Sequence, residues 1–119
     1  MGDRLEAFRS FREKMNARIL ESGHKGLQRF FALDAQAYAP GALPTRTKEL
    51  MGLTASMVLR CDDCIAYHLL RCREEGCGRE ELLDAFNVAL VVGGSIVIPH
   101  LRRAVALLDE IEAAGGKGG

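Results

Sequence analysis

Apolar and polar residues alternate along most of the chain with the period of an amphipathic α-helix. Between Leu5 and Leu20, apolar residues recur every three or four positions with charged residues between them. Further segments of this kind cover residues 24–37, 45–60, 61–75, 79–92 and 95–114. No stretch alternates with period two for long enough to form a strand of a sheet. The pattern therefore predicts an all-α domain of five or six helices.

Glycine and proline residues mark the boundaries between these helices. Ser22-Gly23 ends the first helix, and the segment 38–44, which holds two of the three prolines, is the clearest loop. Thr45 follows this loop and is expected to be the N-cap of the next helix. Gly76-Cys77-Gly78 separates the fourth helix from the fifth. Pro99 is expected either to kink the sixth helix or to occupy its first turn.

The length of the chain fits a single compact domain. Its 119 residues are enough for one domain and not comfortably for two. We expect the domain to cover residues 1–114, with the part that carries the chemistry at 44–113, and a disordered glycine-rich tail at 115–119. Residues 88–92 are apolar around most of their helix, and such a helix is buried on all sides. In a chain this short, a second subunit is expected to supply part of that cover.

Charge and hydropathy exclude several classes of protein. The chain has 16 basic and 16 acidic residues, so it lacks the global positive field of proteins that bind nucleic acid. Its longest apolar stretch, residues 89–99, is interrupted by glycine and serine and is shorter than the roughly 20 residues that cross a bilayer. The charged N-terminus has no apolar core of the kind found in secretory signals. We therefore expect a cytoplasmic protein that binds neither nucleic acid nor membranes.

Four cysteines, Cys61, Cys64, Cys72 and Cys77, provide the first candidate chemistry. Structural disulfides are rare in a reducing compartment, so redox chemistry or metal binding is the better hypothesis. At 100° per residue, Cys61, Cys64 and Cys72 share one stripe of a helix with His68. Two thiols three residues apart at a helix start can form a disulfide reversibly, and the helix amides there lower a thiol pKa. This arrangement predicts a redox-active Cys61–Cys64 pair.

A proton acceptor and a carboxylate accompany the pair. His68 follows Cys64 by four residues, stacks over it on the same face and could accept its proton. Glu49 lies on the preceding helix beside two leucines, where a carboxylate is partly desolvated. If the two helices pack antiparallel, Glu49 reaches His68 but not Cys64 directly. The spacing therefore predicts a relay from carboxylate to imidazole to thiol.

Taken together, Glu49, the Cys61-x-x-Cys64 pair and His68 resemble the signature of alkylhydroperoxidase D-like proteins within the carboxymuconolactone decarboxylase superfamily. The resemblance covers roughly residues 30–110. It implies an all-helical homo-oligomer, a hexamer or a trimer, with thiol-dependent peroxidase or disulfide-reductase activity on a small hydroperoxide or disulfide. On this hypothesis the chain binds no metal, flavin or nicotinamide, and a dithiol carrier or a lipoyl protein supplies the electrons.

One position departs from the pattern of these peroxidases. The best-characterised members carry a histidine immediately before the second cysteine, where this chain has Asp63, and an anion there raises the pKa of Cys64. In line with the resemblance, we assign Cys64 as the thiol that attacks peroxide, because His68 is nearer to it than to Cys61. Cys61, expected to be the more exposed of the two, would resolve the sulfenic acid to a disulfide and then meet the reductant. Glu49 would orient His68 and keep it basic.

Other functions remain open at this point. One is a lyase or isomerase acting on a small carboxylated metabolite, as in the decarboxylase branch of the superfamily. Another is a zinc-stabilised helical oligomer without enzymatic activity, in which the thiol pair and His68 hold the metal. Cys61 and Cys72 are about 16 Å apart along one helix, too far to share one ion. A zinc site would therefore need Glu49 or His100 as a further ligand, while Cys72 and Cys77 fit packing and turn positions better.

Overall fold

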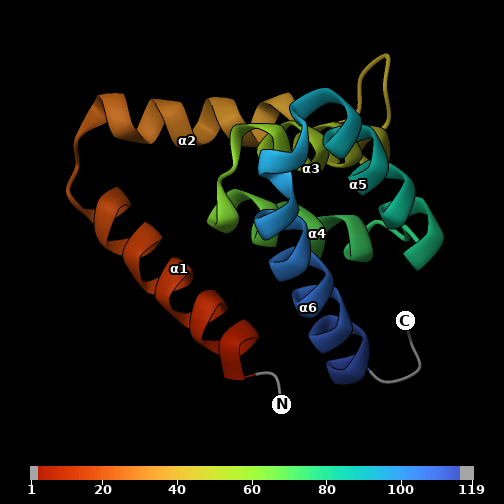
Figure 1. The fold of residues 1–119 in the computed structure, drawn as a ribbon. Helices are drawn as coiled ribbons and strands as arrows, with labels where there is room; N and C mark the ends of the chain where they lie inside the picture. The colour runs from red at the N-terminus through yellow and green to blue at the C-terminus, as the bar shows by residue number, and fades with distance from the viewer. Residues whose placement is uncertain (1–2, 116–119) are drawn as a thin grey trace.

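The computed structural model describes residues 3–115. Its elements, in chain order, are α1 (Asp3–Glu21), α2 (Lys25–Ala37), α3 (Thr45–Leu59), α4 (Asp62–Glu74), α5 (Arg79–Gly93), the 3₁₀-helix η1 (Ser95–Val97) and α6 (Ile98–Ala114) (Figure 1). No strand is present in these residues, so the predicted all-α class is confirmed. The predicted disordered tail lies outside the described residues, except for Gly115, which is the C-cap of α6.

Two of the predicted helix starts differ in detail from the structure. Thr45 is the first residue of α3 and not its N-cap, which is Pro44 and makes no side-chain hydrogen bond. The Thr45 hydroxyl instead donates to the backbone carbonyl of Tyr38 at 2.8 Å, so it holds the loop before the helix. Pro99 occupies the first turn of α6, where a missing N–H has no intrahelical partner to lose.

Helices α3, α4 and α5 form the centre of the molecule, and α6 packs against α4. Arg60 adopts a left-handed conformation (φ 61°) between α3 and α4, which lets the chain reverse within a short connection and lays α4 beside α3. The larger side chains that are almost completely buried are mostly aliphatic, and they are Leu53, Leu69, Leu82, Val97 and Leu108, together with Met57, Cys72, Cys77 and Glu49. This packing gives α3 and α4 a fixed register, which is what positions the site described below.

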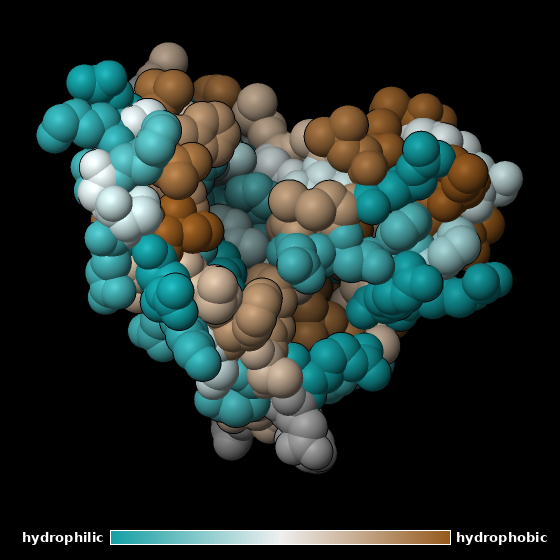
Figure 2. All heavy atoms as spheres, turned by 90° about the vertical axis from the view of Figure 1, so that its left-hand side faces the viewer, coloured by the Kyte–Doolittle hydropathy of each residue, from teal (hydrophilic) through white to brown (hydrophobic). Residues whose placement is uncertain are grey.

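Helices α1 and α2 extend from this core as two arms that meet at a bend (Figure 1). Leu5 buries the start of α1 in the core, whereas α2 has no buried residue. On the side where the arms meet, the surface is hollowed and hydrophobic side chains gather around the hollow (Figure 2). None of the described helices has the length and hydropathy needed to span a membrane.

The apolar end of α5 is not covered within one chain. Val88, Val91 and Val92 are 52%, 78% and 67% exposed. Within the described residues α5 packs against α3 and η1, and these valines lie outside that contact, so part of the expected cover is not supplied by the chain itself. Cover by a second subunit stays a prediction.

Candidate functional site

Cys61 and Cys64 lie at the N-terminal end of α4. Cys61 is the N-cap, and its Sγ accepts a hydrogen bond from the backbone N–H of Cys64 at 3.4 Å. The two Sγ atoms are 2.7 Å apart and both cysteines are free. Since an S–S bond is about 2.05 Å long, only a small movement of the two side chains is needed for the bond to form when an oxidant takes up the two electrons and two protons of the dithiol. The predicted position of the pair at a helix start is confirmed.

The exposure of the two thiols is the reverse of the expected order. Cys64 is exposed, whereas Cys61 is only partly so. The physical reason is the N-cap position, which folds the Cys61 side chain back over the first turn of α4, where its sulfur meets the amide of Cys64. Cys64 stands inside that turn and lines a groove on the surface.

The thiol of Cys64 holds its proton strongly. Its pKa is raised to about 11, first by desolvation, then by the hydrogen bond with Cys61 and by the charges of Cys61, Asp63 and Asp34. The direction expected from Asp63 is thus present, and the helix amide that could oppose it is bonded to Cys61 instead. Nucleophilic chemistry at Cys64 near neutral pH therefore requires a group that takes the proton.

Glu49 and His68 form a buried pair behind the thiols. Oε1 of Glu49 lies 2.8 Å from Nδ1 of His68, and the two residues are 1% and 9% exposed. An ionised carboxylate can only accept, so Nδ1 carries the hydrogen and Nε2 of the neutral ring is the free acceptor. Arg71, one turn further along α4, places its Nε 3.4 Å from Oε2 of Glu49 and compensates the burial of the carboxylate. The predicted contact between Glu49 and His68 is present.

The predicted contact between His68 and Cys64 is absent. Within residues 3–115, His68 forms no hydrogen bond with either thiol. Its Nε2 faces the hydroxyl of Tyr38 at 3.4 Å, and the two rings have centroids 5.3 Å apart. Tyr38 comes from the loop after α2, thirty residues before His68, so no helical spacing in the sequence points to it. Arg71, by contrast, could have been found, because it follows His68 by three residues on the same helix face.

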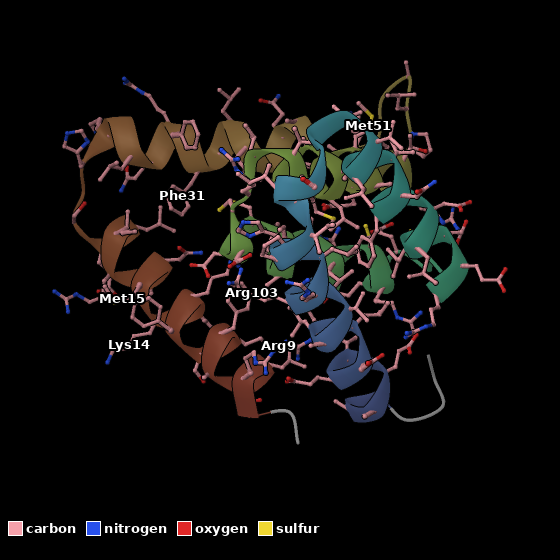
Figure 3. The ribbon with its side chains drawn as sticks, in the orientation of Figure 1. Arg9, Lys14, Met15, Phe31, Met51 and Arg103 are labelled. Carbon is pink, nitrogen blue, oxygen red and sulfur yellow. The ribbon has the colours of Figure 1, made fainter. Side chains whose placement is uncertain are left out.

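A groove of about 990 Å³ opens beside Cys64 and His68, between α1, α4 and α6. Its walls include Phe8, Phe11, Met15, Ile65 and Leu107. Arg103 of α6 lies on the side that faces α1 (Figure 3). Asp62, the first residue of α4, accepts hydrogen bonds from Arg103 at 3.1 Å and from His100 at 2.7 Å, which joins the two helices at the groove. His100 is thus a hydrogen-bonded residue between helices.

The zinc alternative finds no site in the described residues. No three His, Cys, Asp or Glu side chains there are grouped so that they could hold a metal ion. Cys72 and Cys77 are buried at the other end of α4, where the N–H of Cys77 donates to the carbonyl of Cys72 at 2.9 Å and closes the helix. This bond is the one that ends a helix in a Schellman motif, with Gly76 in the left-handed conformation (φ 91°). Cys72 and Cys77 are therefore packing and turn residues, as expected.

Comparisons of the sequence and of the structure with known proteins agree on one protein family. Residues 25–107 match the carboxymuconolactone decarboxylase family. Two crystal structures of the protein TM1620 from Thermotoga maritima are similar to this chain, with TM-scores of 0.90 and 0.86 and sequence identities of 54% and 52%. The first covers 96% of this chain and 99% of its own, and the second covers 95% and 98%. The second is described as a carboxymuconolactone decarboxylase family protein with a suggested involvement in an antioxidative response.

Two more distantly related proteins are also similar to this chain. The protein lpg0406 of Legionella pneumophila, described as a member of the same family, has a TM-score of 0.79 and 26% identity over 93% of this chain and 96% of its own. "Uncharacterized protein 4 in cox locus" of Paracoccus denitrificans is 36% identical over 85 residues, which are 71% of this chain and 77% of that protein.

Proposed function

The chain belongs to the carboxymuconolactone decarboxylase family, and we propose that it is a thiol-dependent oxidoreductase that cycles Cys61 and Cys64 between dithiol and disulfide. Its substrates are small hydroperoxides or disulfides. The observation that carries the proposal is the 2.7 Å approach of the two sulfur atoms at the start of α4, where Cys64 lines an open groove. The suggested antioxidative involvement of a relative that is 52% identical supports the same direction.

The oxidative half of the cycle begins at Cys64, the exposed thiol. Its thiolate attacks the terminal oxygen of the hydroperoxide, the O–O bond breaks, and an alcohol leaves with a proton while the sulfur becomes a sulfenic acid. The Cys61 sulfur then attacks the sulfenic sulfur, an S–S bond forms, and water leaves. The pre-existing contact of the two sulfurs makes this second step intramolecular and fast.

The Glu49–His68 pair supplies the base that the first step needs. With a pKa of about 11, only about one Cys64 in 10⁴ is a thiolate at pH 7. Neutral His68 can accept the proton at Nε2, and the Glu49 carboxylate on Nδ1 keeps this tautomer and balances the imidazolium that results. Glu49 is therefore a positioning residue, and His68 is the base.

The reductive half starts at the same exposed sulfur. A thiolate of a dithiol carrier or of a reduced lipoyl protein attacks the Sγ of Cys64 and forms a mixed disulfide with it, while the Cys61–Cys64 bond breaks with Cys61 as the leaving thiolate. The second thiolate of the carrier then attacks the carrier sulfur of the mixed disulfide, and Cys64 leaves as a thiolate. Cys61 is suited to leave because its sulfur accepts the N–H of Cys64 at the positive end of α4. Because Cys64 is the more exposed thiol, we propose that the reductant contacts Cys64 rather than Cys61.

We include self-association in the proposal. The exposed valines at the end of α5 form an apolar surface that a second copy would cover, and the resemblance implies a trimer or a hexamer. Light scattering at micromolar concentration measures this directly.

The test of the function is peroxide and disulfide consumption by the purified protein with several dithiol reductants, together with mass spectrometry of the thiols. The wild type is expected to turn over and to accumulate a Cys61–Cys64 disulfide when the reductant is exhausted. Cys61→Ser should give one turnover that ends at a Cys64 sulfenic acid, and Cys64→Ser should give none. Cys77→Ala, which removes a buried thiol and leaves the pair intact, serves as the matched control. A folded wild type that consumes neither substrate, or full turnover by Cys64→Ser, would refute the proposal.

A further inference from the structure

The acceptor nitrogen of the catalytic histidine is occupied by a phenol. Nε2 of His68 lies 3.4 Å from the Tyr38 hydroxyl, and the same imidazole is held on its other side by Glu49. A neutral phenol donates to a free ring nitrogen, so the direction of this hydrogen bond is from Tyr38 to His68. A proton that enters Nε2 from a thiol must therefore either displace Tyr38 or pass through it.

Two neighbouring residues allow the contact between Tyr38 and His68. Gly52 of α3 lies against the two side chains, and a Cβ at this position would come within 2.8 Å of the Tyr38 hydroxyl and 2.9 Å of Nε2 of His68. Only a residue without a side chain leaves the two groups together. On the other side, the Thr45 hydroxyl bonds the carbonyl of Tyr38 and holds the loop that carries it.

We propose that Tyr38 connects the thiol of Cys64 to His68, taking the thiol proton on its hydroxyl oxygen while it passes its own proton to Nε2. The inference rests on the proposed function and adds a residue to its site. Tyr38 remains neutral before and after the step, Cys64 becomes a thiolate, and His68 becomes an imidazolium. As the O–O bond breaks, Tyr38 gives its hydroxyl proton to the leaving alkoxide oxygen and takes the proton from Nε2 of His68, so that an alcohol leaves.

The surroundings of Tyr38 suit such a connection. Burial, followed by the charges of Glu49 and Asp34, raises the pKa of the phenol, so it stays protonated at any pH at which the protein would work. Among the hydrogen bonds of residues 3–115 none joins the Tyr38 hydroxyl to Cys64, so the step requires the Cys64 side chain to turn toward the phenol. Cys64 precedes His68 by one helical turn on α4, and Tyr38 approaches from outside that helix.

Tyr67 provides a matched control on the same imidazole. Its ring packs edge-on against His68 with centroids 5.2 Å apart, and the guanidinium of Arg12 lies 3.9 Å above it. Among the hydrogen bonds of residues 3–115, none joins its hydroxyl to His68. Tyr67→Phe therefore removes a hydroxyl from a ring that packs on His68, as Tyr38→Phe does, but it leaves the hydrogen bond between Tyr38 and Nε2 of His68 intact.

The test measures the alkylation rate of Cys64 by iodoacetamide at pH 7.5 in the Cys61→Ser protein, followed by peptide mass spectrometry. This rate reports thiolate formation and does not require any peroxidase activity. Tyr38→Phe is expected to slow it by about tenfold or more, as is His68→Ala, the usual scale for loss of a proton acceptor. The double variant should be no slower than His68→Ala alone, because both changes cut one path. Tyr67→Phe should leave the rate within about twofold.

The outcomes separate the connection from the function. The role of Tyr38 would be overturned if the decreases in alkylation rate of the two single variants multiplied in the double variant, or if folded Tyr38→Phe reacted at the unchanged rate. A melting temperature within a few degrees of wild type confirms that the variant is folded. If Tyr38→Phe does not fold, Gly52→Ala, which separates the same two groups, takes its place in the cycle. Wild-type protein that consumes no peroxide or disulfide but shows the coupled alkylation rates would refute the oxidoreductase function alone.

Discussion

Gly52→Ala offers a direct test of the packing at the site. Gly52 lies inside α3, where helix propensity alone predicts that alanine stabilises the protein by about 1 kcal/mol. The structure predicts the opposite, because the new Cβ would sit 2.8 Å from Cε1 of His68 and 2.8 Å from the Tyr38 hydroxyl. Both distances are far shorter than the roughly 3.5–4.0 Å of an ordinary contact.

The size of the effect follows from which group can move. His68 is buried and bonded to Glu49, so the imidazole cannot retreat without breaking that bond. The end of the Tyr38 side chain can turn outward, which relieves one contact and gives up the hydrogen bond to Nε2. Overpacking of this kind costs about 1–3 kcal/mol. After the gain in propensity is subtracted, the free energy of unfolding should fall by roughly 0–2 kcal/mol.

A matched glycine isolates the packing contribution. Gly26 lies in the first turn of another helix, α2, and a Cβ there would meet only the exposed side chain of His24, the N-cap, at 3.1 and 3.4 Å. Alanine gains no more propensity in the first turn, at Gly26, than in the helix interior, at Gly52, so the difference between the two variants is a lower limit for the overpacking, which costs about 1–3 kcal/mol. For a domain of this size this corresponds to roughly 4–12 °C between their melting temperatures.

Differential scanning calorimetry of the two variants and the wild type measures this difference. Gly26→Ala should melt at or above the wild-type temperature and Gly52→Ala clearly below Gly26→Ala. Equal melting temperatures of the two alanine variants would mean that nothing crowds Gly52, and the contact between Tyr38 and His68 would not be present in solution.

Substitutions at three other positions test separate parts of the site and of the surface. Glu49→Gln keeps the shape of the side chain but removes the charge that balances an imidazolium, so alkylation of Cys64 at pH 7.5 should slow about tenfold or more. Glu49→Ala should in addition lower the free energy of unfolding by about 1–3 kcal/mol, because Nδ1–H of His68 loses its acceptor, and urea titrations measure this change. Burial raises the pKa of Cys72 above its ordinary value of 9.0. As the pH rises, the thiol of Cys72 therefore ionises in the unfolded chain before it ionises in the folded one. Its contribution to the free energy of unfolding is fully present below about pH 9 and is lost above it. The melting temperature of Cys72→Ala should therefore fall less than that of the wild type between pH 8 and 10.5. Val91→Glu should reduce the particle mass measured by light scattering, and a wild type that is monomeric at micromolar concentration would contradict the predicted self-association.

Features that depend on neighbours in the chain could be predicted from the sequence. The positions of the helices follow from the 3.6-residue period and from glycine and proline, which act on the backbone where they stand. Cys61 at the start of α4 and its closeness to Cys64 are of the same kind, because three residues along a helix fix the distance between side chains. The pairing of Glu49 with His68 was also within reach, since a short connection forces α3 and α4 to lie side by side.

The other features of the site depend on contacts between parts of the chain that are far apart in the sequence. Tyr38 reaches Nε2 of His68 across thirty residues and a loop that Thr45 anchors, and no periodicity encodes such a path. Gly52 reads as a helix-weakening residue until the two side chains that press against it are known. Cys64 lines the groove between α1, α4 and α6, whose walls come from distant parts of the chain. In each case a contact between backbone and side chains in three dimensions, rather than residue type or spacing, determined which atoms meet at the site.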